Sequence, residues 1–335
     1  PSISLDQDEL TKIRGVHHYE ERLLYFLIRL QNPRTRLIYV TSQPIHPSII
    51  DYYLELLHGV PFSHARDRLL LLSVYDCSPR SLSEKLLCRP RLMERIRQAM
   101  HPEQSYMVCY NSTPWERQLS VALDIPLFAL DPALLNWGTK SGSRQIFADS
   151  GVPHPDGSQL VHTVPELAVQ AAALWERQPN LKRMVIKLDE GFSGQGNALL
   201  PLNSLQHVAP DQATHGDRAA AFEQAFEHLS FQSDTETWAH FSAQICQLGA
   251  ITEAFVEGEN KRSPSVQGRI DPLGEVEILS THDQILGGPD QQTFLGCSFP
   301  ADPSLTTPDT VEVPAASVVQ LAPEHHQARK PRHLP

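Results

Sequence analysis

The sequence predicts an α/β protein of two domains, and two observations support this fold class. Up to residue 131, short continuous apolar runs alternate with stretches of helical periodicity, which is typical of a parallel sheet covered by helices on both faces. From Trp137 onward, helices, a glycine-rich hairpin and an antiparallel meander follow one another, which is an α+β order. We therefore expect a doubly wound domain over residues 1–135, an α+β domain over 136–300 and an unpacked tail over 301–335.

The first domain alternates expected strands with expected helices. Its apolar runs of strand length are 37–40, 69–74, 106–109 and 125–130. Its helical stretches are 8–30, 47–57, 81–100 and 113–123. The last helix starts with a capping box, in which Thr113 is the N-cap, Pro114 the first helical residue and Glu116 the reciprocal acceptor. Because ligands of such sheets bind beyond the strand ends, the loops at 41–44 and 111–113 are candidate ligand loops.

The second domain divides into two parts. The part over 136–250 contains an expected helix that ends near residue 149 and a second helix that Thr163 caps. A hairpin over 183–200 and two further helices, at 219–229 and 235–248, complete this part. The part over 251–300 contains expected strands at 251–256, 263–270 and 275–280, with a turn at 272–274.

Charge and cysteine content exclude several classes of function. The formal net charge is -11, and an acidic protein repels nucleic acid and anionic membranes. The 5 cysteines show no C-x-x-C spacing, so neither a disulfide framework nor a zinc site is indicated. The longest apolar runs have the length of a strand, and the N-terminus carries no signal-peptide pattern. We expect a cytoplasmic protein that binds neither nucleic acid nor membranes.

The hairpin over 183–200 carries the clearest functional signal. Its first strand ends in Lys187, and the loop after it contains Gly191, Ser193, Gly194 and Gly196. Glycines let the main chain approach a ligand closely, and a lysine neutralises phosphate charge. The stretch matches neither a Walker loop, nor a Rossmann fingerprint, nor a nucleophile elbow. It indicates either a hairpin lid over the phosphates of a nucleotide or an ordinary turn beside a solvated lysine.

Several segments, taken in order, carry a resemblance to a known family. They are YVTS at 39–42, GTKSGSR at 138–144, GVP at 151–153, VIK at 185–187, EAFVEG at 253–258, SPSVQ at 263–267 and STHDQ at 280–284. With these segments the sequence resembles the ATP-grasp superfamily of carboxylate–amine ligases, in the branch related to the pheganomycin-type peptide ligase. The resemblance implies a pre-ATP-grasp domain followed by an ATP-grasp domain.

The resemblance also implies roles for individual residues. The implied ATP-binding residues are Lys140, Lys187, Ser193, Gly194, Gly196, Glu253, Ala254, Val256 and Glu259. The lysines would hold phosphates, the serine and glycines would close over them, the strand main chain would meet the adenine, and the last glutamate would lie near the ribose. The residues implied at the acyl-phosphate side are Arg262, Arg269 and His282 as catalytic groups and Gln267 as a substrate contact. Strand alternation would put Gln267 and Arg269 on one side.

The implied reaction is the phosphorylation of a carboxylate by ATP, followed by attack of an amine on the acyl phosphate. Magnesium would accompany ATP, and the substrates would be amino acids or peptides, with a homodimer as a candidate assembly. Members of the superfamily carry a Glu-x-Asn strand after the region that corresponds to Pro300, and 301–335 contains no such motif. We therefore expect an incomplete magnesium site, with its ligands unknown. The alternative reading is a catalytically impaired protein that binds nucleotide.

Overall fold

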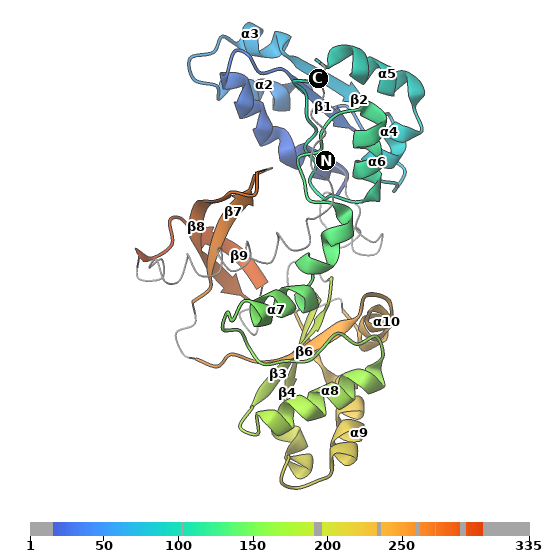
Figure 1. The fold of residues 1–335 in the computed structure, drawn as a ribbon, viewed down its shortest axis with the longest axis vertical. Coiled ribbons are helices and arrows are strands. Elements are labelled where there is room, and N and C mark those ends of the chain that lie inside the picture. The colour runs from blue at the N-terminus through green and yellow to red at the C-terminus, as the bar shows by residue number, and fades with distance from the viewer. Residues whose placement is uncertain are drawn as a thin grey trace. The chain divides into compact units, whose positions relative to one another are not determined.

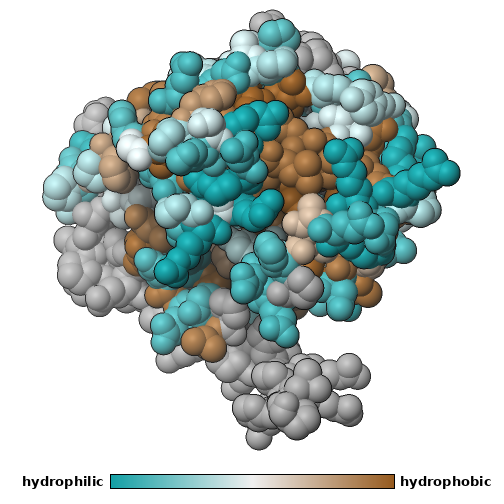
Figure 2. Space-filling model, turned by 90° about the horizontal axis from the view of Figure 1, so that it is seen from above, coloured by the Kyte–Doolittle hydropathy of each residue, from teal (hydrophilic) through white to brown (hydrophobic). Residues whose placement is uncertain are grey.

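The structure is a computed structural model, and it describes residues 16–101, 103–190, 196–232, 236–258, 262–271, 273–288 and 293–303 (Figure 1). The chain divides into two compact units, Pro1–Leu135 and Asn136–Pro335. No helix within the described ranges is long and apolar enough to cross a membrane. Apolar areas enclosed by hydrophilic ones are visible on the surface in Figure 2, as is usual for a folded protein.

Unit 1 is built around two parallel strands. Strand β1, Leu37–Thr41, pairs with β2, Leu69–Ser73, in a continuous register. The crossover between them contains helices α2, Pro47–Glu55, and α3, Phe62–Asp67, because parallel neighbours need a long connection. The 3-10 helix η1, Val16–Gln31, precedes β1.

Helices cover both faces of this sheet, which confirms the doubly wound architecture. Tyr39 and Leu69 belong to a core with η1, α2 and α3. Leu72 belongs to a second core, and the partly buried Ile38 and Val40 pack against that core. The second core includes side chains of α4, Leu82–Leu87, α5, Pro90–Ala99, and α6, Pro114–Leu123.

Two expectations for unit 1 are wrong in detail. The helix expected over 81–100 is interrupted, because Pro90 has no N–H to continue the first helix and instead starts α5. The strands expected at 106–109 and 125–130 reduce to one parallel bridge between Met107 and Leu127. Pro126 lacks a donor, and Phe128 is half exposed rather than buried between layers. The capping box of Thr113 and Glu116 forms as expected.

Unit 2 contains an antiparallel sheet in the order β5-β4-β3-β6. The strands are β3, Arg183–Leu188, β4, Asn197–Pro201, β5, Ser230–Phe231, and β6, Ala250–Ala254. One face packs on α8, Val164–Arg177, α9, His215–Ala225, and α10, Trp238–Leu248, and Figure 1 shows α8 and α9 beside this sheet. Thr163 caps α8 as expected, by accepting from the Glu166 N–H at 3.3 Å.

The remaining helices of unit 2 are short or lie at its start. They are η2, Pro132–Gly138, which begins in unit 1, α7, Lys140–Asp149, η3, Asn203–Val208, and η4, Phe226–His228. Arg218 of α9 is 1% exposed. It holds α9 against the end of η3 and the segment that follows by donating to the carbonyls of Val208, Ala209 and Ala213. A buried guanidinium is stable here because its donors are satisfied.

A separate antiparallel meander follows. Its strands are β7, Pro264–Ile270, β8, Val276–Gly287, and β9, Thr293–Ser298. β8 is longer than the strand expected at 275–280, because its second half pairs with β9, a strand that the sequence pattern did not reveal. A register shift lies between Gln267 and Gly268, so that one residue more of β8 faces β7.

Candidate functional site

One face of β3 and β6 turns away from the helical core and carries charged side chains. Met184, Ile186 and Leu188 are buried in the core, so alternation puts Val185 and Lys187 on the opposite face. In the antiparallel register Val185 pairs with Glu253 and Lys187 pairs with Ile251. Lys187 and Glu253 are therefore diagonal neighbours on this open face.

The Glu253 carboxylate binds two cations. Its Oε2 pairs with the Lys187 ammonium, and its Oε1 lies 3.0 Å from Arg144 Nη1. The Glu253 side chain is 9% exposed, against 14% for Arg144 and 27% for Lys187. Partial burial makes these charge-assisted bonds stronger than surface ion pairs. Because two cations share one carboxylate, the group keeps a surplus positive charge that points to an anionic ligand.

Lys140 starts α7 close to the end of β3. The Lys140 N–H donates to the Asp189 carbonyl at 3.2 Å, and the Ser141 N–H donates to Asp189 Oδ1 at 2.7 Å. Asp189, which directly follows β3 and is 5% exposed, therefore holds the first turn of α7 against the strand end. Burial lowers the pKa of the Lys140 ammonium below its ordinary value, and the charge of Lys187 lowers that pKa further.

The first turn of α7 has room for no side chain at position 142. A Cβ added to Gly142 would lie 1.8 Å from the Asn136 carbonyl oxygen. Thr139, the N-cap, accepts from the Gly142 N–H at 3.1 Å. Lys140 and Arg144 lie four residues apart on α7, hence on one face. The turn thus places Arg144 beside Glu253, while the Lys140 ammonium lies 3.4 Å from the Asp189 carbonyl.

The segment that follows β6 offers a main-chain edge and an apolar surface. The Ala254 N–H is engaged, because it donates to the Asp156 carbonyl at 2.8 Å. Val256 is 60% exposed, and none of the described residues accepts a hydrogen bond from its N–H. Val185, Leu199 and Phe255 form a small buried apolar cluster of the sheet, and the Arg183 guanidinium lies over the Phe255 ring at 4.0 Å from its centroid. A planar heterocycle could bond to the Val256 N–H beside this cluster.

Three of the expected ATP-binding residues, Ser193, Gly194 and Glu259, lie outside the described residues. Gly196 is buried, and its carbonyl accepts from the Leu188 N–H at 2.8 Å, which closes the described base of the hairpin.

The residues expected at the acyl-phosphate side lie in the meander and its approach. Arg262 Nη1 lies 3.1 Å from Asp302 Oδ2 and 3.6 Å from Asp283 Oδ2. Arg269 Nη2 lies 2.6 Å from Glu277 Oε2, with both side chains more than half exposed. Each arginine thus has a carboxylate partner.

His282 and Gln267 share one face of the meander. Ser265 pairs with His282, and Gln267 pairs with Ser280, whose Oγ lies 3.5 Å from His282 Nε2. Asp283 follows His282 in β8, so it points to the other face. The strands therefore group His282 with Gln267, whereas Arg262 pairs with the opposite face through Asp283.

Three of the residues in this arrangement were not selected from the sequence. Arg144 and Gly142 stand within the GTKSGSR segment, and Asp189 directly follows the strand that carries Lys187. The spacing of Lys140 and Arg144 on an expected helix was the signal that could have identified Arg144. Within the described ranges, no group of three or more His, Cys, Asp or Glu side chains is arranged to hold a metal ion.

Comparisons with known proteins point to one family. Residues 133–235 match the family model described as IQCH-like, ATP-grasp. IQ motif-containing protein H of Danio rerio is 25% identical over 337 residues, which cover 90% of this chain and 32% of that protein. The L-propargylglycine–L-glutamate ligase of Streptantibioticus cattleyicolor is 29% identical over 301 residues, which cover 88% of this chain and 58% of that enzyme. The chain thus spans less than two thirds of either relative.

A solved structure supports the same fold. The crystal structure of the beta-gamma-ATP complex of biotin carboxylase from Campylobacter jejuni matches with a TM-score of 0.54 at 16% identity. The match covers 88% of this chain and 57% of that chain. At this identity the similarity concerns the fold alone. Residues 133–235 are thus similar to the IQCH-like ATP-grasp family, and the chain has an ATP-grasp α/β fold.

Proposed function

We propose that the chain is the nucleotide-binding part of an ATP-dependent ligase that joins a carboxylate to an amine. The observation that carries the proposal is the grouping of Lys140, Lys187 and Arg144 near the end of β3, where Lys187 and Arg144 share the Glu253 carboxylate next to an exposed main-chain edge. A surplus of cations in a partly buried site favours a polyanion, because charge-assisted bonds strengthen where water is scarce.

Described residues support a role for each end of ATP in this proposal. Lys140 and Lys187 would neutralise phosphate oxygens, and the hairpin loop after Lys187 would cover them. The apolar cluster of Val185, Leu199 and Phe255 would support the adenine, whose edge would accept from the Val256 N–H. The Ala254 N–H is already bonded, so Ala254 would contribute through its carbonyl.

The proposed reaction has two steps. The substrate carboxylate attacks the γ-phosphorus of ATP, and ADP leaves, which gives an acyl phosphate. The amine then attacks the acyl carbon, loses a proton, and phosphate leaves as the amide forms. The protein contributes mainly by positioning, by charge neutralisation and by exclusion of water. The described residues include no cluster of His, Cys, Asp or Glu that fits magnesium, the expected companion of ATP.

The carboxylate substrate is proposed to be an amino acid or a peptide. The relative from Streptantibioticus cattleyicolor is named as a ligase of two amino acids, and this supports the class. Gln267 and His282 share a face that could contact the substrate, and Arg262 or Arg269 could hold its carboxylate bidentately after releasing a carboxylate partner.

A second candidate function is nucleotide binding without ligation. The observation that favours it is the lack, among the described residues, of a carboxylate group arranged for a metal ion. We also propose a cytoplasmic location, which the 5 free cysteines support because a reducing compartment preserves thiols.

Replacement of Lys187 tests the nucleotide site. We expect Lys187→Ala to raise the dissociation constant for Mg-ATP by about tenfold to a hundredfold, because a charge-assisted contact is lost. Titration calorimetry measures the affinity, and ADP release with mixed amino acids measures ligation. The matched control is Lys182→Ala, since Lys182 is an exposed lysine just before β3. Equal ATP affinity in the two variants would contradict the proposal, and ATP binding without ADP release would favour the second candidate function.

Replacement of Gly142 tests the role of the first turn of α7. Because a Cβ at this position would overlap the Asn136 carbonyl oxygen, Gly142→Ala must displace the turn that carries Lys140. We expect ATP affinity to fall at least about tenfold, as for loss of one ionic contact. Gly138→Ala is the control, since a Cβ there meets nothing within 4 Å. The interpretation fails if the two variants bind ATP equally well while both retain the native circular dichroism spectrum.

The lowered pKa of Lys140 predicts a pH dependence of ATP binding. A lysine binds phosphate in its charged form, which is lost as the pH rises through its pKa. Because that pKa lies below the ordinary value of about 10.4, ATP affinity should start to fall at a lower pH than for an ordinary lysine. Affinities between about pH 8 and pH 10.5 measure this. Lys140→Arg should move the decline to higher pH, and an unchanged profile would count against Lys140 as a phosphate ligand.

A further inference from the structure

A pocket in unit 1 lies where β2 ends and α5 begins. Its volume is about 630 Å3, and it is lined by residues 73–74, 89–92 and Arg95. This volume is in the range of small-molecule sites, which combine apolar walls with a few polar groups. Ligands of open α/β sheets also bind beyond the carboxyl ends of the strands, which is where Ser73 lies.

Arg89 forms a fixed side of this pocket. Its Nη1 donates to the Lys85 carbonyl at 2.8 Å, and its Nη2 lies 2.9 Å from Asp76 Oδ2. Hydrogen bonds from Ser78 and Arg89 hold the pKa of the Asp76 carboxyl well below its usual range. Asp76 therefore stays ionised, and Arg89 is held in place.

The buried Lys85, whose carbonyl accepts from Arg89, is itself held by hydrogen bonds. Lys85 is 4% exposed, and its ammonium donates to Ser42 Oγ at 2.9 Å and to the Asp76 carbonyl at 3.0 Å. Ser42 in turn donates to the Glu20 carboxylate at 2.7 Å. These bonds join the ends of β1 and β2 to α4, so the pocket is preorganised.

Arg91 and Arg95 provide cationic groups that the described part of the chain does not neutralise. They lie four residues apart on α5, hence on one face of that helix. Neither guanidinium forms an ion pair or hydrogen bond with a described residue, and both side chains are exposed. The acidic groups nearby are already engaged: Asp76 and Glu84 with Arg80, and Glu94 with Arg97 at 3.3 Å.

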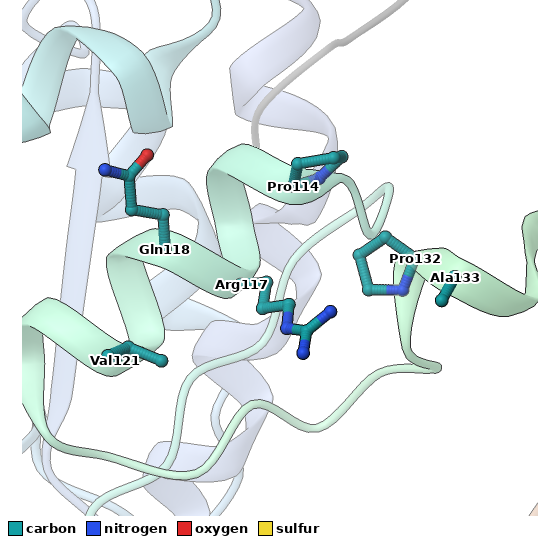
Figure 3. A pocket seen from close by; sticks show the side chains of 6 residues that line it. All are labelled: Pro114, Arg117, Gln118, Val121, Pro132 and Ala133. Atoms are coloured by element: carbon teal, nitrogen blue, oxygen red, sulfur yellow. The ribbon is translucent and has the colours of Figure 1, made fainter.

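Another pocket of unit 1 shows the contrast. It lies between α6 and the start of η2 and is lined by Pro114, Arg117, Gln118, Val121, Pro132 and Ala133 (Figure 3). Its arginine, Arg117, lies 3.3 Å from Asp131 Oδ1. The only arginine that lines that pocket is therefore already paired with a carboxylate. The pocket at the end of β2, in contrast, is lined by two arginines without such a partner among the described residues.

We propose that the pocket at the end of β2 binds a small organic anion. Arg91 and Arg95 hold its carboxylate or phosphate group, and its apolar part lies against Val74, Pro90 and Leu92. Arginine suits either group because its planar fork bonds to two oxygens at once. The site is independent of the nucleotide site in unit 2 and of the proposed ligase activity.

Titration of the full chain with three matched probes tests the proposal. The probes are phenylacetate, phenyl phosphate and, as the neutral counterpart, benzyl alcohol. We expect saturable binding of at least one anion and none of benzyl alcohol. The variant Arg91→Gln/Arg95→Gln should bind that anion about tenfold or more weakly, because charge-assisted bonds are lost. The control Arg36→Gln, which replaces an exposed arginine just before β1 and outside the pocket, should bind it as the unmodified chain does.

The outcomes separate this site from the nucleotide site. Lys187→Ala should leave anion binding unchanged even where it weakens ATP binding. Tighter binding of phenylacetate assigns a carboxylate to the site, and tighter binding of phenyl phosphate assigns a phosphate. Absence of saturation with both anions overturns the proposal, as does equal affinity in the double variant. Loss of anion binding in Lys187→Ala overturns it too, because the anion would then occupy the nucleotide site.

Discussion

The pairing of the Glu253 carboxylate with Lys187 and Arg144 is the interaction on which the candidate site depends. It joins three elements, β3, β6 and α7, that lie far apart in the sequence. A carboxylate that is 9% exposed would be costly without cations, and two neighbouring cations would repel each other without it. Each charge therefore stabilises the position of the others. The arrangement holds side chains for a polyanion in place before any ligand binds.

A second constraint fixes the lysine of α7 against the same strand. Asp189 binds two main-chain N–H groups of the first turn of α7, and Gly142 allows the Asn136 carbonyl to approach that turn. Burial and the nearby Lys187 disfavour the charged form of Lys140, and phosphate oxygens would reverse this penalty. The side chains of Lys140 and Lys187 thus suit phosphate oxygens, while the open main-chain edge at Val256 suits a flat base. This is the physical argument for nucleotide as the ligand.

Local signals in the sequence predicted local structure well and long-range contacts poorly. The caps at Thr113 and Thr163 and the hairpin that carries Lys187 depend on neighbouring residues, and they form as expected. The strand expected at 125–130 forms only a bridge. Pro126 lacks an N–H donor, and Phe128 is half exposed, which depends on the residues that pack against it. The role of Arg144 depends on Glu253, which lies 109 residues later, and no local pattern encodes that pairing. β9 was not expected either, and it pairs with the second half of β8, far from any local turn signal that the sequence analysis used.

The most direct measurement is a crystal structure of the chain with a non-hydrolysable ATP analogue. The account predicts the ammonium groups of Lys140 and Lys187 within hydrogen-bond distance of phosphate oxygens, which is roughly 2.7–3.2 Å. It also predicts the adenine edge on the Val256 N–H, beside the apolar cluster of Val185, Leu199 and Phe255. A nucleotide bound anywhere on the protein without contact to Lys140 or Lys187 would contradict the account.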